Sequence, residues 1–176
     1  SVKNREFAKL EQKLFKYLRM YKRNFSELIC YDDSRFVAGM SDWQALRNTT
    51  GNYYILDIND FKTNLRKGIV NYSGKFDEVL GVIKYYNKFL LSPVEYMEES
   101  NYNEYCLQLS IYAFLFELMW DRVKIGSLNL FYISEDLEVT KIPVPYLRPQ
   151  AIAILDRFCT MKDIKTDKLI NRSYEQ

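Results

Sequence analysis

The spacing of apolar residues predicts helices near both ends of the chain and in its centre. Apolar residues recur every three or four positions between residues 3 and 23, which is typical of an amphipathic helix: Phe7, Leu10, Leu14, Leu18 and Tyr21. From 104 to 124 the chain is apolar on nearly all sides, so this helix is expected to be buried against a sheet and to end near Gly126. Further helices are predicted at 76–91 and 149–158, and the polar tail from Thr160 onward is expected to be disordered.

Shorter apolar runs between turn residues predict strands. Residues 31–34 and 135–136 carry turn residues and predict two hairpins, while 48–52 predicts a second turn and 65–73 a loop. The predicted strands are 25–30, 35–40, 53–58, 128–134 and 137–143. The run 53–58 is apolar on both faces at first, so it is expected to be a central strand. This order of elements predicts an α/β (α+β) fold with a mixed central β-sheet flanked by helices.

The chain has 176 residues and a net charge of +2, which predicts a single domain over 1–176. We divide it into a basic N-terminal helix (1–24), a core (25–145) and a C-terminal helix with a polar tail (146–176). Its apolar stretches fall short of the roughly 20 residues that a membrane span needs, and we expect no secretory signal, because no basic segment followed by an apolar run is seen at its start. We therefore expect no membrane partner.

The absence of histidine excludes a Ser-His-Asp triad, a Cys-His dyad and histidine-ligated zinc. Any general base must come from carboxylates, Lys, Tyr, Cys or water. Cys30, Cys106 and Cys159 are odd in number and widely spaced, which argues against a disulfide framework. Such cysteine usage favours a reducing, cytoplasmic setting.

The N-terminal segment is strongly basic, with eight Lys or Arg against two Glu in residues 1–24. A solvated helix face and a phosphate-contacting arm are both compatible with this stripe. Its DNA-binding candidates are Lys13, Lys16, Arg19, Lys22 and Arg23. Some aromatic residues could stack on DNA bases, although most are expected in the core or at its rim. The candidates are Tyr85, Tyr86, Phe89, Tyr102 and Tyr105.

Carboxylates and a lysine gather at the end of the predicted central strand. Asp60 and Lys62 are two residues apart, so they project from the same side of a strand. Asp42 ends the preceding strand and can approach Asp60 across the pairing, and Glu27 on the first strand could supply a further oxygen. Two convergent carboxylates beside a lysine suit a hard divalent cation. Gln108 and Tyr112 lie one turn apart on the apolar helix, and a buried Gln needs polar partners.

These motifs together resemble the PD-(D/E)xK nuclease superfamily, and most closely its RecB-like exonuclease branch, which includes nuclease-like proteins of tailed phages. The motifs, in order, are Glu27, Gly39-x-x-Asp42, Asp60-x-Lys62-Thr63 and Gln108-x-x-x-Tyr112. The resemblance spans roughly residues 25–120. It implies a restriction-endonuclease-like core and a Mg²⁺- or Mn²⁺-dependent deoxyribonuclease, with an exonuclease as the expected kind, that acts in phage DNA replication, recombination or processing.

The resemblance also implies roles for individual residues. Asp42, Asp60, Glu27 and the carbonyl of Phe61 would hold one or two metal ions, and Lys62 would position the attacking water. Gln108 and Tyr112 would steady the site or touch the DNA backbone, with Thr63 as a further DNA contact. The expected partner is single- or double-stranded DNA, with a recombination or replication protein as a second candidate, in the host cytoplasm if the chain is phage-encoded.

Two alternatives stay open at the level of sequence. Asp57-Ile58-Asn59 offers a competing register in which Asn59 replaces the lysine and the site is degenerate. We prefer the Asp60 register because the string from Asp60 to Asn64 fits the family. The second alternative is a catalytically decayed nuclease fold that binds nucleic acid or serves as an assembly partner. Histidine, present in an early helix of many relatives, is absent here.

Overall fold

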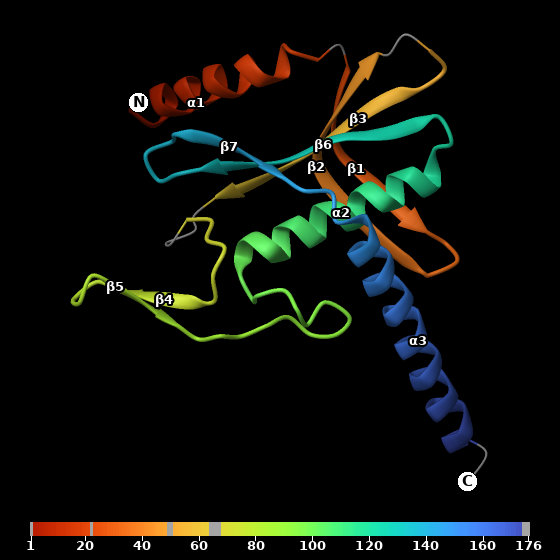
Figure 1. Ribbon diagram of the computed structural model, residues 1–176. Helices are drawn as coiled ribbons and strands as arrows, with labels where there is room; N and C mark the ends of the chain where they lie inside the picture. Colours follow the sequence, from red (N-terminus) through yellow and green to blue (C-terminus); the bar gives the residue numbers. More distant parts are fainter. Residues whose placement is uncertain (1, 22, 49–50, 64–67, 174–176) are drawn as a thin grey trace.

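A mixed five-stranded sheet forms the centre of the protein in the computed structural model (Figure 1). The structure describes the backbone of residues 2–21, 23–48, 51–63 and 68–173, and the side chains of 8–21, 23–47, 51–63 and 68–160. Across the sheet the order is β1 (Arg23–Asp32), β2 (Val37–Asn48), β3 (Tyr54–Thr63), β6 (Val123–Ile133) and β7 (Val139–Val144). Only the β3–β6 pair among these is parallel. The predicted α/β class and the central position of residues 53–58 are confirmed.

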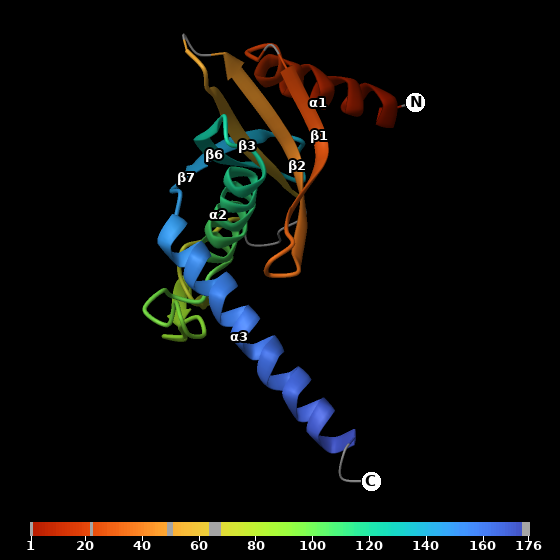
Figure 2. The same ribbon diagram turned by 90° about the vertical axis from the view of Figure 1, so that its right-hand side faces the viewer.

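Helices cover both faces of this sheet (Figures 1 and 2). The helix α1 (Val2–Leu18) lies on one face, and α2 (Asn101–Met119) crosses the other on the way from β3 to β6. The helix α3 (Arg148–Ser173) packs against α2 at its start and then extends away from the sheet. In the described part of the chain, no helix has the length and apolar character that a membrane span requires.

The main core lies between the sheet and α2, where period-two apolar positions of the strands meet an almost entirely apolar helix. Leu56 and Ile58 of β3 are fully buried there, against Leu109 and Ala113 of α2. Ser100 caps the start of the helix by accepting a hydrogen bond from the Asn103 amide. The extensive burial of α2 fixes how this helix sits on the sheet, and with it the position of its few polar residues.

A second, aromatic cluster joins α1 to the opposite face of the sheet. Trp43 is 4% exposed and stacks on Phe61 at 6.1 Å between ring centroids, while Phe131 contacts both rings. Tyr17 and Tyr21 of α1 add edge-to-face contacts to Phe131 and Trp43. The cluster therefore holds β2, β3 and β6 together where β3 nears its end.

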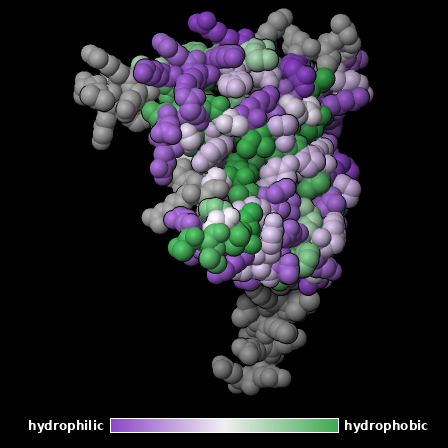
Figure 3. Space-filling view, turned by 60° about the vertical axis from the view of Figure 1, so that its left-hand side comes forward, coloured by the Kyte–Doolittle hydropathy of each residue, from purple (hydrophilic) through white to green (hydrophobic). Residues whose placement is uncertain are grey.

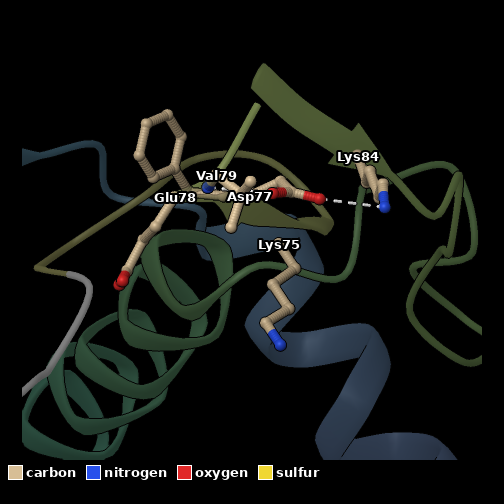
Figure 4. Close-up of a pocket in the computed structure, with 6 residues that line it drawn as sticks. Lys75, Asp77, Glu78, Val79 and Lys84 are labelled. Atoms are coloured by element: carbon tan, nitrogen blue, oxygen red, sulfur yellow. Dashed lines mark hydrogen bonds and ion pairs between the residues drawn. The ribbon is translucent and has the colours of Figure 1, made fainter. Parts of the chain in front are cut away.

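The prediction of a helix at 76–91 is wrong. This segment instead contains the hairpin of β4 (Gly74–Asp77) and β5 (Val82–Tyr85), followed by irregular chain. The Asp77 carboxylate accepts hydrogen bonds from the amides of Val79 and Leu80, and Gly81 adopts a φ of 65°. Such a turn competes with helix formation because the side chain takes amides that a helix would need. Figure 4 shows the Asp77 carboxylate directed at Lys84, with a 3.0 Å ion pair across the hairpin.

Several predicted boundaries also differ from the structure. The first helix ends at Leu18 rather than at 23, and α2 ends at Met119, so Gly126 lies inside β6 instead of ending a helix. The second strand of the first hairpin runs to Asn48 and not to 40. The tail beyond Thr160, expected to be disordered, continues α3 to Ser173. Apolar content alone could not separate the end of a buried helix from the buried strand after it.

Removal of the Trp43 ring tests the aromatic cluster. Trp43→Ala is expected to lower the free energy of unfolding by about 3–5 kcal/mol, because a buried indole leaves a cavity between three rings. Urea unfolding followed by circular dichroism measures this change, with Met20→Ala, at a 72% exposed position, as the control. A loss below about 1 kcal/mol would show that the cluster does not hold the strands together.

Candidate active site

The end of β3 presents its side chains to two different environments. Leu56 and Ile58 face α2, so Asp60 and Lys62, which follow at steps of two, lie on the α2 side as well. Phe61 points to the other face and packs in the aromatic cluster. The alternation of side chains along β3 therefore places Asp60 and Lys62 on one face and the aromatic rings that anchor the strand on the other.

Asp42 meets this pair at the point where two strands part. The β2–β3 ladder ends at the pair Trp43–Asn59, one step before Asp42 and Asp60. Beyond that point the Asp42 carboxylate replaces the backbone partner and accepts a hydrogen bond from the Phe61 amide, with 2.9 Å between Oδ2 and N. Asp42 is thus fixed by the backbone of β3 and lies beside the carboxylate of Asp60.

Lys62 is 17% exposed and surrounded by three groups. Its Nζ lies 2.5 Å from Asp60 Oδ2 in an ion pair and 3.1 Å from Gln108 Oε1, to which it donates a hydrogen bond. The ring of Tyr105 lies beneath the ammonium, with 4.4 Å from Nζ to the ring centroid. The lysine is therefore held by a charge, an amide oxygen and an aromatic face.

Gln108 links Lys62 to a second residue of α2. Its Nε2 donates to the Tyr112 hydroxyl at 2.9 Å, one helical turn further on. The Tyr112 ring lies over Gly39 of β2, where an added Cβ would stand 2.6 Å from Cε1 of the ring. The glycine of the Gly39-x-x-Asp42 motif therefore leaves room for the tyrosine, and burial raises the pKa of Tyr112.

Burial also controls the charge of Asp60, which is 3% exposed. Its pKa rises from 3.8 to about 6, mainly because of desolvation; Lys62 lowers it and the Asp42 carboxylate raises it. Oδ2 is buried and lies in the ion pair with the Lys62 ammonium. Carboxylate oxygens are the ligands that a hard divalent cation prefers.

The structure does not bring Glu27 to the other two carboxylates. In the main-chain register Glu27 falls opposite Asp42, between the pairs Ser26–Trp43 and Leu28–Ser41, but it is exposed and has a φ of 55°. Within the described ranges, no group of three or more Asp, Glu, Cys or His is placed to hold a metal. The left-handed backbone at Glu27 breaks the alternation of β1, which a sequence pattern does not reveal.

The competing motif of Asp57 and Asn59 lies on the other face of β3. Asp57 is 2% exposed, pairs with Arg47 at 2.7 Å and accepts a hydrogen bond from the Ser127 amide. The side chain of Asn59 accepts a hydrogen bond from Asn129 Nδ2 at 2.9 Å. Both residues thus serve contacts between strands, and the Asp60 register is the one that meets Asp42 and α2.

The DNA-binding candidates are spread over the surface rather than gathered at the site. Lys13 is engaged by Glu138 at 2.5 Å and by the Leu137 carbonyl at 3.2 Å, while Lys16, Arg19, Arg23 and Thr63 are exposed. Lys22 lies outside the described residues. The exposed cations of α1 leave a basic surface on the side of the sheet away from Asp60.

Tyr105 is the site residue whose role the sequence did not predict. It was one of several aromatic candidates for base stacking, whereas the structure places its ring under Lys62. The signal was present, since Tyr105, Gln108 and Tyr112 recur at steps of three and four on one helix stripe. Only the position of α2 over the end of β3 reveals that this stripe faces the lysine.

No family model matches the sequence, and no curated protein matches it. A similar solved structure is that of a protein from Eubacterium rectale described as "Putative exonuclease", with 12% sequence identity and a TM-score of 0.46. The match covers 93% of this chain but 55% of the other, so the chain spans about half the length of that protein. A likeness at this level does not indicate a function.

The raised pKa of Asp60 predicts how stability changes with pH. Between about pH 4 and 6 the folded protein binds more protons at Asp60 than the unfolded chain does, so stability falls as the pH rises through this range. Asp60→Asn removes this contribution, and the variant is expected to gain about 1–3 kcal/mol relative to wild type at pH 7 in a chelator-containing buffer.

Urea unfolding at pH 4, 5, 6 and 7 measures the slope for both proteins. Asp121→Asn is the matched control, because this exposed residue lies just before β6, whose first residue pairs with Tyr54 at the opposite end of β3 from Asp60. An equal slope in wild type and Asp60→Asn would show that Asp60 titrates as it does in the unfolded chain.

Proposed function

We propose that the protein is a metal-dependent deoxyribonuclease of the PD-(D/E)xK type, which hydrolyses phosphodiester bonds at the Asp42–Asp60–Lys62 site. The observation that carries this proposal is the convergence of two carboxylates and a lysine from adjacent strands, with Gln108 of α2 on the lysine. All of these side chains belong to motifs whose order resembles that superfamily. The absence of histidine is compatible with this chemistry, which needs none.

The donor set of the site fits a hard divalent cation. Asp42 and Asp60 offer carboxylate oxygens, and the buried Asp60 Oδ2 is paired with the Lys62 ammonium. The Phe61 amide points to Asp42, and since the N–H and C=O of one strand residue share an edge, its carbonyl is expected on that side too. Mg²⁺ commonly binds through one or two protein carboxylates and keeps several waters, so Glu27 is not needed as a ligand.

When bound, such a cation supplies charge neutralisation and lowers the pKa of a bound water. The residues of the chain supply the rest. Asp42 and Asp60 hold a fixed negative corner, since one is tied to the backbone of β3 and the other is buried. Lys62 places a positive charge beside that corner, where it can orient a water and stabilise charge that develops on a phosphate oxygen. Gln108 and Tyr112 fix the lysine from the helix side.

The substrate proposed is DNA, and an exonuclease mode in phage DNA replication, recombination or processing follows from the resemblance to the RecB-like branch. The exposed cations of α1 are candidates for contact with the phosphate backbone. Neither strand preference nor polarity of digestion follows from the described contacts, so the experiment varies the DNA ends directly.

The test compares linear, nicked and closed-circular DNA with Mg²⁺ or Mn²⁺, for wild type and Lys62→Ala. We expect linear DNA to be degraded, chelator to stop the reaction, and Lys62→Ala to lower the rate by at least 10²-fold, because it removes the one cation at the carboxylate corner. Lys124→Ala is the matched control, since Lys124 lies at the other end of β6 and contacts Tyr53. Sparing of closed circles identifies an exonuclease.

Full cleavage by Lys62→Ala would refute the site. No cleavage by wild type with either metal, together with DNA binding that weakens steeply with salt, would instead favour a decayed nuclease fold. In that case, charge-removing variants of Lys16 and Arg19 would lower DNA affinity while Asp60→Asn would not.

A further inference from the structure

The ion pair between Lys62 and Asp60 conflicts with the proposed use of Asp60 as a metal ligand. The ammonium lies 2.5 Å from Oδ2, a buried oxygen of the carboxylate that would bind the metal. Two cations cannot both approach one oxygen closely without strong repulsion. In the metal-bound state, therefore, Lys62 needs a holder other than Asp60.

The structure offers two neutral holders on α2. Gln108 Oε1 accepts a hydrogen bond from Nζ at 3.1 Å. The Tyr105 ring, three residues earlier on the same stripe of α2, has its centroid 4.4 Å from Nζ. A ring face attracts an ammonium through its quadrupole and does not compete for a divalent cation as a carboxylate does. Because the Lys62 side chain is only 17% exposed, water alone cannot take the place of these two contacts to the ammonium.

We propose that Tyr105 is a positioning residue that holds the Lys62 ammonium in place when Asp60 is occupied by the metal. This inference rests on the proposed nuclease function and assigns a role within the same site. Tyr105 acts through its ring face and not through its hydroxyl. The competing role, stacking on a DNA base, needs a free ring face, and in the structure Lys62 occupies one face of the ring.

The side chain at 105 can be changed in two graded steps. Tyr105→Phe keeps the ring and removes the hydroxyl, while Tyr105→Leu removes the ring and keeps much of the apolar volume. Tyr31→Leu is the matched control, because this 44% exposed tyrosine lies at the far end of β1. Circular dichroism and thermal unfolding establish that each variant is folded.

The first readout is independent of cleavage. In protein labelled with ¹³C-lysine, the Lys62 Hε signal, identified by its absence in Lys62→Arg, is expected upfield because the lysine lies over an aromatic ring. With Mg²⁺ alone the upfield shift should persist in wild type and Tyr105→Phe and disappear in Tyr105→Leu. An unchanged Lys62 signal in Tyr105→Leu would overturn the proposal, whether or not the protein is a nuclease.

The second readout is steady-state cleavage of linear DNA. Tyr105→Leu is expected to lower kcat on the order of tenfold with KM changed less than twofold, and Tyr105→Phe to restore kcat. A raised KM with unchanged kcat would instead assign the ring to DNA binding and overturn the positioning role. If wild type cleaves no DNA while the Lys62 signal behaves as expected, the proposed function fails and the contact between Tyr105 and Lys62 stands.

Discussion

The whole site depends on the two-sided burial of strand β3. A strand covered on one face only could turn polar residues to solvent, whereas β3 has α2 on one side and the aromatic cluster on the other. The alternation of side chains then leaves little freedom: Phe61 must enter the rings, so Asp60 and Lys62 must face the helix. A slip of one residue would place two charges among Trp43 and Phe131.

Burial of these charges is the energetic cost of the arrangement. Desolvation raises the pKa of Asp60 to about 6, and the compensating contacts come from different parts of the fold, with Lys62 on the same strand and Gln108 on α2. A buried ion pair is often less stabilising than an apolar pair of similar size. The large apolar core on the α2 side of the sheet offsets this cost.

Much of the fold could be predicted from the sequence because it rests on local pattern. The first hairpin, the central strand and the apolar helix all follow from period-two and period-3.6 spacing. The segment 74–85 could not be predicted, since its apolar residues recur at helical steps and only the turn at Asp77 decides for a hairpin. Ends of elements also escaped the pattern, as at Met119, where a buried helix is followed closely by a buried strand.

The candidate site was predictable where residues share a strand or a helix stripe. Asp60 with Lys62 and Gln108 with Tyr112 follow from spacing, and Asp42 follows from the hairpin. Glu27 did not join them because one left-handed residue in β1 changes the direction of its side chain. The pairing of Tyr105 with Lys62 depends on how α2 crosses the sheet, which is a property of tertiary packing and lies beyond any local pattern.

The parting of β2 and β3 has a consequence for how the sequence can change over time. Where the ladder ends, Asp42 replaces a missing strand partner for the Phe61 amide, so it serves the fold as well as the proposed chemistry. A descendant that lost its activity would still suffer from an unpaired amide if it lost this aspartate. The Lys62 side chain, by contrast, contacts the side chains of Asp60 and Gln108 and not a backbone amide. Among relatives of the proposed nuclease, an intact Asp42 would therefore say little about activity, and the residue at position 62 would be the better marker of an intact site.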